Sequence, residues 1–167
     1  MKKILSVVLI VFLSACASKT TKPTGTDGSP EDASLSEQDT SSGSPTVNPL
    51  TDPNNILSKR SVYFDFDKYV VKDKYNSMVL SHARYLRDNS NASIRLEGNA
   101  DERGSREYNL ALGQRRADSV KRVMTLAGTQ ESQIESVSYG EEKPRAVGHN
   151  EDAWAENRRA DIRYQGE

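Results

Sequence analysis

The sequence has very few of the side chains that most often carry catalysis or bind metals. Its 167 residues include one cysteine, Cys16, and two histidines. His82 and His149 lie far apart along the chain, with no H-E-x-x-H or similar metal-binding spacing. A Gly-rich phosphate loop and a Gly-x-Ser-x-Gly nucleophile elbow are also missing. The sequence therefore favours a protein that is not an enzyme, and we expect no metal and no cofactor.

A strong net charge is also absent. Lysine and arginine number 23 against 24 aspartates and glutamates, which gives a formal net charge of -1 at pH 7. This balance provides no electrostatic basis for binding nucleic acid and argues against a broad basic surface for membranes. The length is sufficient for one modest domain.

The sequence has no apolar run long enough to span a bilayer. The most apolar stretch, residues 4–13, has about ten residues, too few for a hydrocarbon core of ~30 Å. It follows the basic start Met1-Lys2-Lys3 and is typical of a signal peptide, which we assign to residues 1–15. We therefore expect the domain to work outside the cytoplasm.

The single cysteine follows that stretch directly, in Leu13-Ser14-Ala15-Cys16. This motif resembles a bacterial lipobox, in which the thiol is lipidated and cleavage makes the cysteine the new amino terminus. The alternative is ordinary cleavage at the A-x-A pattern of residues 15–17, but that would leave a free thiol without a use. We favour lipidation of Cys16, and several acyl chains would give stable anchoring. Ala17 behind the cysteine, rather than aspartate, resembles lipoproteins sorted to the outer membrane.

A different composition begins at residue 18. The chain up to about residue 56 is dominated by Ser, Thr, Asp, Gly and Pro and has almost no large apolar residue. Such a segment cannot bury enough surface to offset its ordering entropy. We therefore predict that residues 16–56 form a lipidated cysteine followed by a disordered tether, which could extend to ~130 Å at most.

Apolar periodicity predicts a folded α/β domain over residues 57–167. Alternation indicates four strands, around Val62–Phe66, Ile94–Leu96, Ile134–Tyr139 and Ala160–Tyr164. Helical spacing indicates one helix from Tyr75 to about Asn89 and another from an N-cap at Ser105 to Gly128. A loop with Pro144 and Trp154 joins the last two strands. This order favours a layered fold with helices packed on a four-stranded sheet, its first two strands parallel.

The second predicted helix has a cation on its apolar side. On a helical wheel, Arg116 and Asn109 project between Leu112 and Val120. A guanidinium cannot lose its charge on burial, so Arg116 needs an anion. That anion is either an internal carboxylate or a ligand, and the helix pattern alone favours the internal ion pair. His82, on the apolar stripe of the first helix, is predicted to be a packed histidine.

Polar side chains follow the first two predicted strands. Phe66 and Asp67 come after the first strand, and Asn99, Asp101, Glu102 and Arg103 after the second. Ligands of open α/β sheets bind beyond the carboxyl ends of the strands. Carboxylates and a guanidinium in one region would suit a zwitterion, such as the free end of an amino acid.

Several motifs carry a family resemblance. They are "YFDFDKY" at residues 63–69, "GNADERGSREYNLALGQRRADSV" at 98–120, "SYGEEKP" at 138–144 and "ENRRADI" at 156–162. In this order they resemble the OmpA-like peptidoglycan-binding domain family, in particular the peptidoglycan-associated lipoproteins of the Tol-Pal system. The resemblance spans residues 62 to 164 and implies that the sheet is mixed.

The resemblance implies a ligand and the residues that hold it. Members of the family bind meso-diaminopimelate of peptidoglycan stem peptides without a covalent bond. An aspartate at the place of Asp101 and an arginine at the place of Arg116 grip its free amino acid end, and Phe66 and Asp67 help to line the pocket. Asn109 belongs to the same signature and is included in the predicted site. These roles favour the ligand as the anion of Arg116.

Two parts of the motifs are left out of the predicted site. Asn99 stands where many family members have histidine, so we assign it no role. Arg158 and Arg159 match the family, but they lie at a strand start, and a structural salt bridge is the preferred interpretation of at least one of them.

The resemblance also implies partners and a location. We expect a non-enzymatic tether between the outer membrane and the cell wall, with TolB and TolA as periplasmic partners and a part in cell division. The alternatives are a stator-type protein of the flagellar motor, which should carry an uncleaved membrane helix, and a cell-wall hydrolase, which would need a water-activating group.

Overall fold

The structure, a computed structural model, describes residues 48–166. The predicted signal peptide, the lipidation site Cys16 and residues 18–47 of the predicted tether lie outside the described residues. Among residues 48–166, no helix is both long and apolar enough to cross a membrane.

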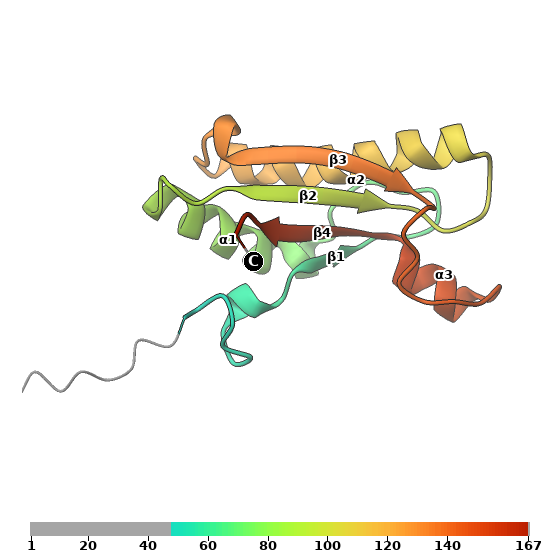
Figure 1. The fold of residues 1–167 in the computed structure, drawn as a ribbon, viewed down its shortest axis with the longest axis horizontal. Coiled ribbons are helices and arrows are strands. Elements are labelled where there is room, and N and C mark those ends of the chain that lie inside the picture. Colours follow the sequence, from blue (N-terminus) through green and yellow to red (C-terminus); the bar gives the residue numbers. More distant parts are fainter. Residues whose placement is uncertain (1–47, 167) are drawn as a thin grey trace, which may run out of the picture. The chain divides into compact units, whose positions relative to one another are not determined.

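Four strands form one mixed sheet, as Figure 1 shows. They are β1 (Ser61–Tyr63), β2 (Ile94–Asn99), β3 (Ile134–Gly140) and β4 (Arg159–Tyr164). The order across the sheet is β1-β4-β2-β3, with β4 antiparallel to both of its neighbours and β2 parallel to β3. The first two strands run in the same direction, as predicted, but β4 lies between them. The predicted layered α/β fold with a mixed four-stranded sheet is confirmed.

Two long helices, α1 (Asn76–Asp88) and α2 (Arg106–Leu126), cover one face of this sheet (Figure 1). Both ends of α2 agree with the prediction. The Ser105 hydroxyl accepts a hydrogen bond from the Tyr108 N–H at 3.2 Å, which caps the first turn. Gly128, just beyond the helix, has a φ of 96°, a conformation that favours glycine.

The hydrophobic core lies between these helices and the sheet. Alternate residues of the strands enter it, such as Leu96 of β2 and Ile162 of β4, and Val120 of α2 packs there as well. His82 is fully buried beside this core, with its ring nitrogens 2.9 Å from the Tyr164 hydroxyl and 2.9 Å from the Lys59 carbonyl. The prediction of a packed histidine is confirmed.

Helix α2 approaches the sheet unusually closely. A Cβ atom at Gly98 of β2 would lie 1.8 Å from the carbonyl oxygen of Gly113, and one at Gly113 would lie 2.3 Å from the Ser138 hydroxyl oxygen. Both positions therefore require glycine. This contact places the first half of α2 directly beside the carboxyl end of β2.

The first strand is shorter than its alternating pattern predicts. It ends at Tyr63, although the N–H of Phe64 still donates to the Arg158 carbonyl at 2.9 Å. Asp67 then takes a φ of 54°, which turns the chain and leaves Phe66 56% exposed. The last aromatic residue of the alternating pattern therefore belongs to a loop.

A third helix, α3 (Glu151–Asn157), replaces part of the loop predicted between the last two strands. Its N-cap is Asn150, whose side-chain oxygen accepts from the Ala153 N–H at 2.9 Å. Glu151 and Asp152 place negative charge in its first turn, where the helix dipole favours it. The prediction of a loop is wrong here because a helix of seven residues has too few turns to show periodicity.

Candidate functional site

A pocket of about 290 Å³ lies where the chain leaves β1 and β2, beside the first turns of α2. Its lining comes from three segments: Phe66 and Asp67 after β1, Asp101, Arg103 and Gly104 after β2, and Tyr108, Asn109 and Leu112 from α2. Four of the five predicted binding residues are thus brought together. The fifth, Arg116, is not part of the lining.

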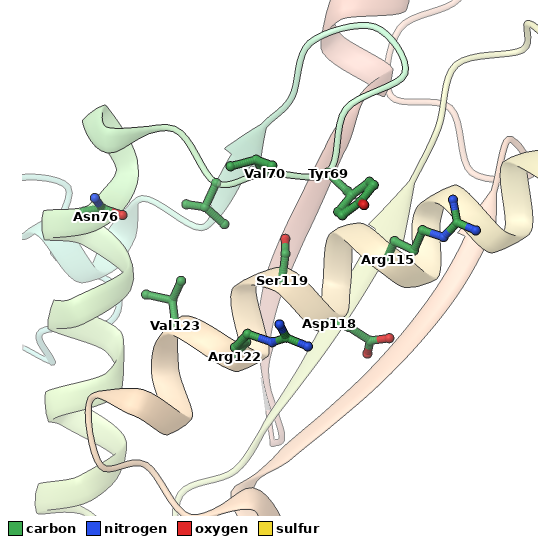
Figure 2. A pocket seen from close by; sticks show the side chains of 9 residues that line it. Tyr69, Val70, Asn76, Arg115, Asp118, Ser119, Arg122 and Val123 are labelled. Carbon is green, nitrogen blue, oxygen red and sulfur yellow. The ribbon is translucent and has the colours of Figure 1, made fainter.

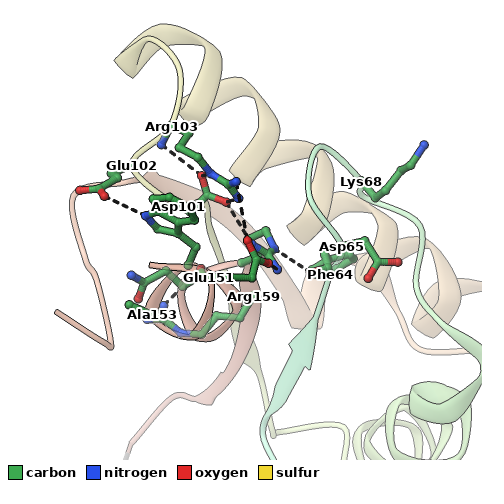
Figure 3. Close-up of polar contacts among 12 residues, drawn as sticks. Phe64, Asp65, Lys68, Asp101, Glu102, Arg103, Glu151, Ala153 and Arg159 are labelled. Atoms are coloured by element: carbon green, nitrogen blue, oxygen red, sulfur yellow. Dashed lines mark hydrogen bonds and ion pairs between the residues drawn. The ribbon is translucent and has the colours of Figure 1, made fainter. Parts of the chain in front are cut away.

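Asp101 is the buried carboxylate of the pocket, at 5% exposure. Its Oδ1 accepts from the backbone N–H and from Nε of Arg103, both at 3.1 Å. Its Oδ2 accepts from Nη2 of Arg103 at 2.8 Å and from Nη1 of Arg158 at 3.4 Å (Figure 3). Burial raises the pKa of this carboxyl, but the hydrogen bonds and charge of Arg103, followed by Arg158, outweigh burial and leave the pKa below its ordinary value.

Arg103 lies between two aromatic rings. The carbon of its guanidinium is 4.1 Å from the ring centre of Phe66 and 4.1 Å from that of Trp154. Glu102 fixes Trp154 by accepting from its indole N–H at 2.8 Å. The sequence placed Arg103 at the strand end but did not predict this stacking, because Trp154 belongs to a distant segment.

Asp67 forms the opposite rim of the pocket. Its φ of 54° is uncommon for a residue with a side chain. The carboxylate accepts a hydrogen bond from the Tyr108 hydroxyl, which links the β1 loop to α2. Tyr108 was not predicted as a site residue, although its place one residue before Asn109 puts it on the same turn.

Arg116 is fully buried beneath the loop that carries Phe66 and Asp67. Its guanidinium donates to three backbone carbonyls, those of Lys68 at 2.9 Å, Asn99 at 2.8 Å and Asp65 at 3.2 Å. Burial lowers its pKa to about 10, so it stays charged near neutral pH.

This environment bears on the internal ion pair that the helix pattern favoured as the alternative to a ligand. Among residues 48–166, no carboxylate lies within ion-pair distance of Arg116, so the predicted internal ion pair is not found in the part of the chain that the structure describes. Three of its five N–H groups are used by the carbonyls, and two remain for another acceptor.

The remaining predicted residues have mainly structural contacts. Asn109 is 1% exposed and its amide donates to Glu141. Arg158 pairs with Glu151 at 2.6 Å, and Arg159 pairs with Asp161 at 2.9 Å, which confirms the prediction of a structural salt bridge. Asn99 is also buried, but it does not line the pocket.

A second, larger hollow lies farther along α2. Figure 2 shows it between the helix and the segment with Tyr69 and Val70, with Arg115 and Arg122 at its border. Its volume is about 480 Å³. None of the predicted binding residues lines it, so the smaller pocket is the candidate site.

Comparison with known proteins identifies the class of domain. The model of the OmpA family matches residues 63–158. A similar fold occurs in the C-terminal domain of Helicobacter pylori MotB, with a TM-score of 0.59 over 65% of this chain and 85% of that one. At 17% identity, this likeness concerns the fold alone.

Relatives with higher sequence identity show to which group within the OmpA family the chain belongs. The peptidoglycan-associated lipoprotein of Pasteurella multocida is 49% identical over 104 residues, 62% of this chain and 69% of the relative. That of Haemophilus influenzae is also 49% identical, over 62% of this chain and 68% of the relative. The crystal structure of the Burkholderia pseudomallei peptidoglycan-associated lipoprotein has 55% identity and a TM-score of 0.70, covering 71% of this chain and 100% of that one. The chain therefore belongs to the OmpA family and, within it, to the peptidoglycan-associated lipoproteins.

Proposed function

We propose that this chain binds peptidoglycan without a covalent bond, by the meso-diaminopimelate of the stem peptides. The observation that carries the proposal is the pocket that gathers Phe66, Asp67, Asp101 and Asn109 at the strand ends of a peptidoglycan-associated lipoprotein. Arg116 lies directly behind it, bonded to carbonyls on either side of the Phe66–Asp67 turn.

The two charged groups suit the two ends of a zwitterion. The carboxylate of Asp101 holds the ligand's ammonium, and the two N–H groups of Arg116 not taken by carbonyls hold its carboxylate. The three carbonyl bonds keep the guanidinium in one orientation, so it is ordered before the ligand arrives. Phe66 provides an exposed apolar wall.

The proposal extends to the role of the whole chain. A lipid on Cys16 anchors the protein in the outer membrane, and the tether allows the domain to reach the cell wall in the periplasm. The chain then acts as a non-enzymatic link of the Tol-Pal system, with TolB and TolA as partners and a part in envelope integrity and cell division.

A sacculus pull-down with the full chain in detergent tests the proposed ligand. We compare wall containing free diaminopimelate with wall in which its carboxylate is amidated and with lysine-type wall. Losing one charge-assisted contact costs ~1.5 to 3 kcal/mol, so binding should weaken roughly ten- to over a hundredfold. Equal binding to free and amidated wall would contradict the proposal.

Variants then test the proposed contact of Arg116. Arg116→Ala should lose most binding to unmodified wall and lose little more when the wall is amidated, because the partner of the carboxylate is already gone. Arg115→Ala is the matched control, since it removes the neighbouring exposed arginine outside the pocket. Binding of a folded Arg116→Ala protein at the wild-type level would exclude the proposed contact.

A further inference from the structure

The carboxylate of Asp101 has no free acceptor position in the structure. A carboxylate offers about four lone-pair sites, and each oxygen of Asp101 already accepts two hydrogen bonds. A ligand's ammonium therefore reaches Asp101 only if one of these donors leaves. The donors are the backbone N–H and the guanidinium of Arg103, and the guanidinium of Arg158.

Two of the three donors are fixed. The backbone N–H belongs to the turn after β2. The side chain of Arg158 is 7% exposed and is also held by the Phe64 carbonyl at 3.2 Å and by Glu151 at 2.6 Å. The side chain of Arg103, by contrast, lines the pocket and is 30% exposed. It is the donor that can move.

A second carboxylate, that of Glu151, lies near the Arg103 guanidinium. Nη1 of Arg103 is 3.7 Å from Oε2 of Glu151, whose side chain is 63% exposed (Figure 3). The guanidinium carbon is 4.1 Å from the ring centres of both Phe66 and Trp154, so a shift of about 1 Å towards Glu151 leaves both distances within the ~6 Å range of cation–π contacts.

We propose that Arg103 is an internal competitor for Asp101: it occupies the place of the ligand's ammonium in the free protein and moves to Glu151 on binding. The inference rests on the proposed function of the pocket. It implies that part of the ligand's affinity is lost in displacing Arg103. A simple amine displaces Arg103 poorly, whereas a ligand that also brings a carboxylate to Arg116 has a second contact to offset the displacement.

Calorimetry with the full chain in detergent tests the competition, with a soluble disaccharide tripeptide that ends in meso-diaminopimelate as the probe. Arg103→Met removes the charge and keeps an unbranched apolar side chain between the rings. It should bind the probe roughly three- to tenfold more tightly than wild type. Arg106→Met is the control, because Arg106 pairs with Glu142 outside the pocket and its loss removes the same charge.

A modified probe tests whether the higher affinity of Arg103→Met depends on the ammonium of the ligand. When the free amine of the diaminopimelate is acetylated, it cannot pair with Asp101, and Arg103→Met should then gain nothing over wild type. Equal or weaker binding of the unmodified probe by Arg103→Met, with normal binding by wild type, would overturn the inference and leave the proposed function standing. No binding by wild type would overturn both.

A measurement on the wild-type chain avoids any effect of the substitution on folding. The Nε–H of Arg103 is bonded to Asp101 in the free protein, so its NMR signal should shift and exchange faster with water at saturating probe. The corresponding signal of Arg158, bonded to the Phe64 carbonyl, should stay in place. An Arg103 signal that does not respond to the probe would contradict the displacement.

Discussion

Backbone carbonyls, rather than a carboxylate, accept the hydrogen bonds of Arg116 within residues 48–166. A fully buried guanidinium is costly unless its donors are satisfied, and here three backbone carbonyls satisfy them in part. Two of these carbonyls flank the Phe66–Asp67 turn, and the third closes β2. One planar side chain thereby joins the loops that carry both sides of the pocket. A lysine ammonium is a single point charge and cannot join three carbonyls that are spread around a fork.

We expect His82 to make the stability of the fold depend on pH. Burial lowers its pKa to about 4 from the ordinary 6.5, so the folded protein binds the proton less well than the unfolded chain. The stabilisation is therefore complete above pH 6.5 and is lost as pH falls towards 4. The slope approaches ~1.4 kcal/mol per pH unit, or about 3 kcal/mol over the window. Urea unfolding of the full chain at pH 7 and pH 4.5 measures this loss.

Carboxylates also titrate near the acid end of this window, so the comparison needs variants. His82→Gln should be less stable than wild type at pH 7 but should lose less stability on acidification. Leu80→Gln, at an exposed position of the same helix, should keep the wild-type dependence, because it removes no titratable group. If His82→Gln and wild type lost stability in parallel, the buried histidine would not be the responsible group.

At the scale of elements, the sequence correctly predicted the features that residues close together along the chain determine. Helix α2 has an N-cap serine, a long apolar stripe and a terminal glycine, and its predicted ends agree with the structure. Helix α3 is too short to show such a stripe. The predicted extent of β1 was wrong for another reason: the alternating residues continue to Phe66, although the strand ends at Tyr63 and the chain turns at Asp67.

Only part of the candidate site was predicted, because its other contacts join segments that are far apart along the chain. The rule that ligands bind beyond strand ends placed Phe66, Asp67 and Asp101 in one region, and the structure brings them into one pocket. The stacking of Arg103 on Trp154 could not be predicted, because it depends on how α3 packs beside the loop after β2. The carbonyl partners of Arg116 depend likewise on the exact path of the β1 loop.

The close contact of α2 with β2 leads to a prediction about Gly113. Gly113→Ala would place a methyl group 2.8 Å from the Gly98 carbonyl oxygen and 2.3 Å from the Ser138 hydroxyl oxygen. The backbone of β2 cannot yield cheaply, so we expect α2 to shift outward at a cost of about 3 kcal/mol. Thermal unfolding should show a lower Tm, and sacculus binding should weaken because Asn109 and Leu112 move with the helix.

The control for this prediction is Arg122→Ala, an exposed position on the same helix. It should leave the Tm close to that of wild type, because substitutions at exposed sites usually change stability by less than ~0.5 kcal/mol. If Gly113→Ala had the Tm of wild type, α2 and β2 could move apart without loss of stability, which would contradict the prediction.

At the scale of the whole molecule, two activities are assigned to different parts of the chain. The pocket lies within residues 48–166, whereas the predicted anchor is Cys16, outside the described residues. The proposed link between membrane and wall needs both ends. The proposal predicts that each end can be removed while the other keeps its property.

Cys16→Ser tests this separation. A serine cannot form the thioether to diacylglycerol, so the precursor should stay uncleaved by the lipoprotein signal peptidase and should incorporate no labelled palmitate. The purified variant should still bind sacculi as wild type does, because its pocket is unchanged. The converse variant, Arg116→Ala, should take up palmitate normally and lose wall binding. Palmitate in Cys16→Ser would contradict the predicted anchor, and loss of its sacculus binding would show that the two ends do not act independently.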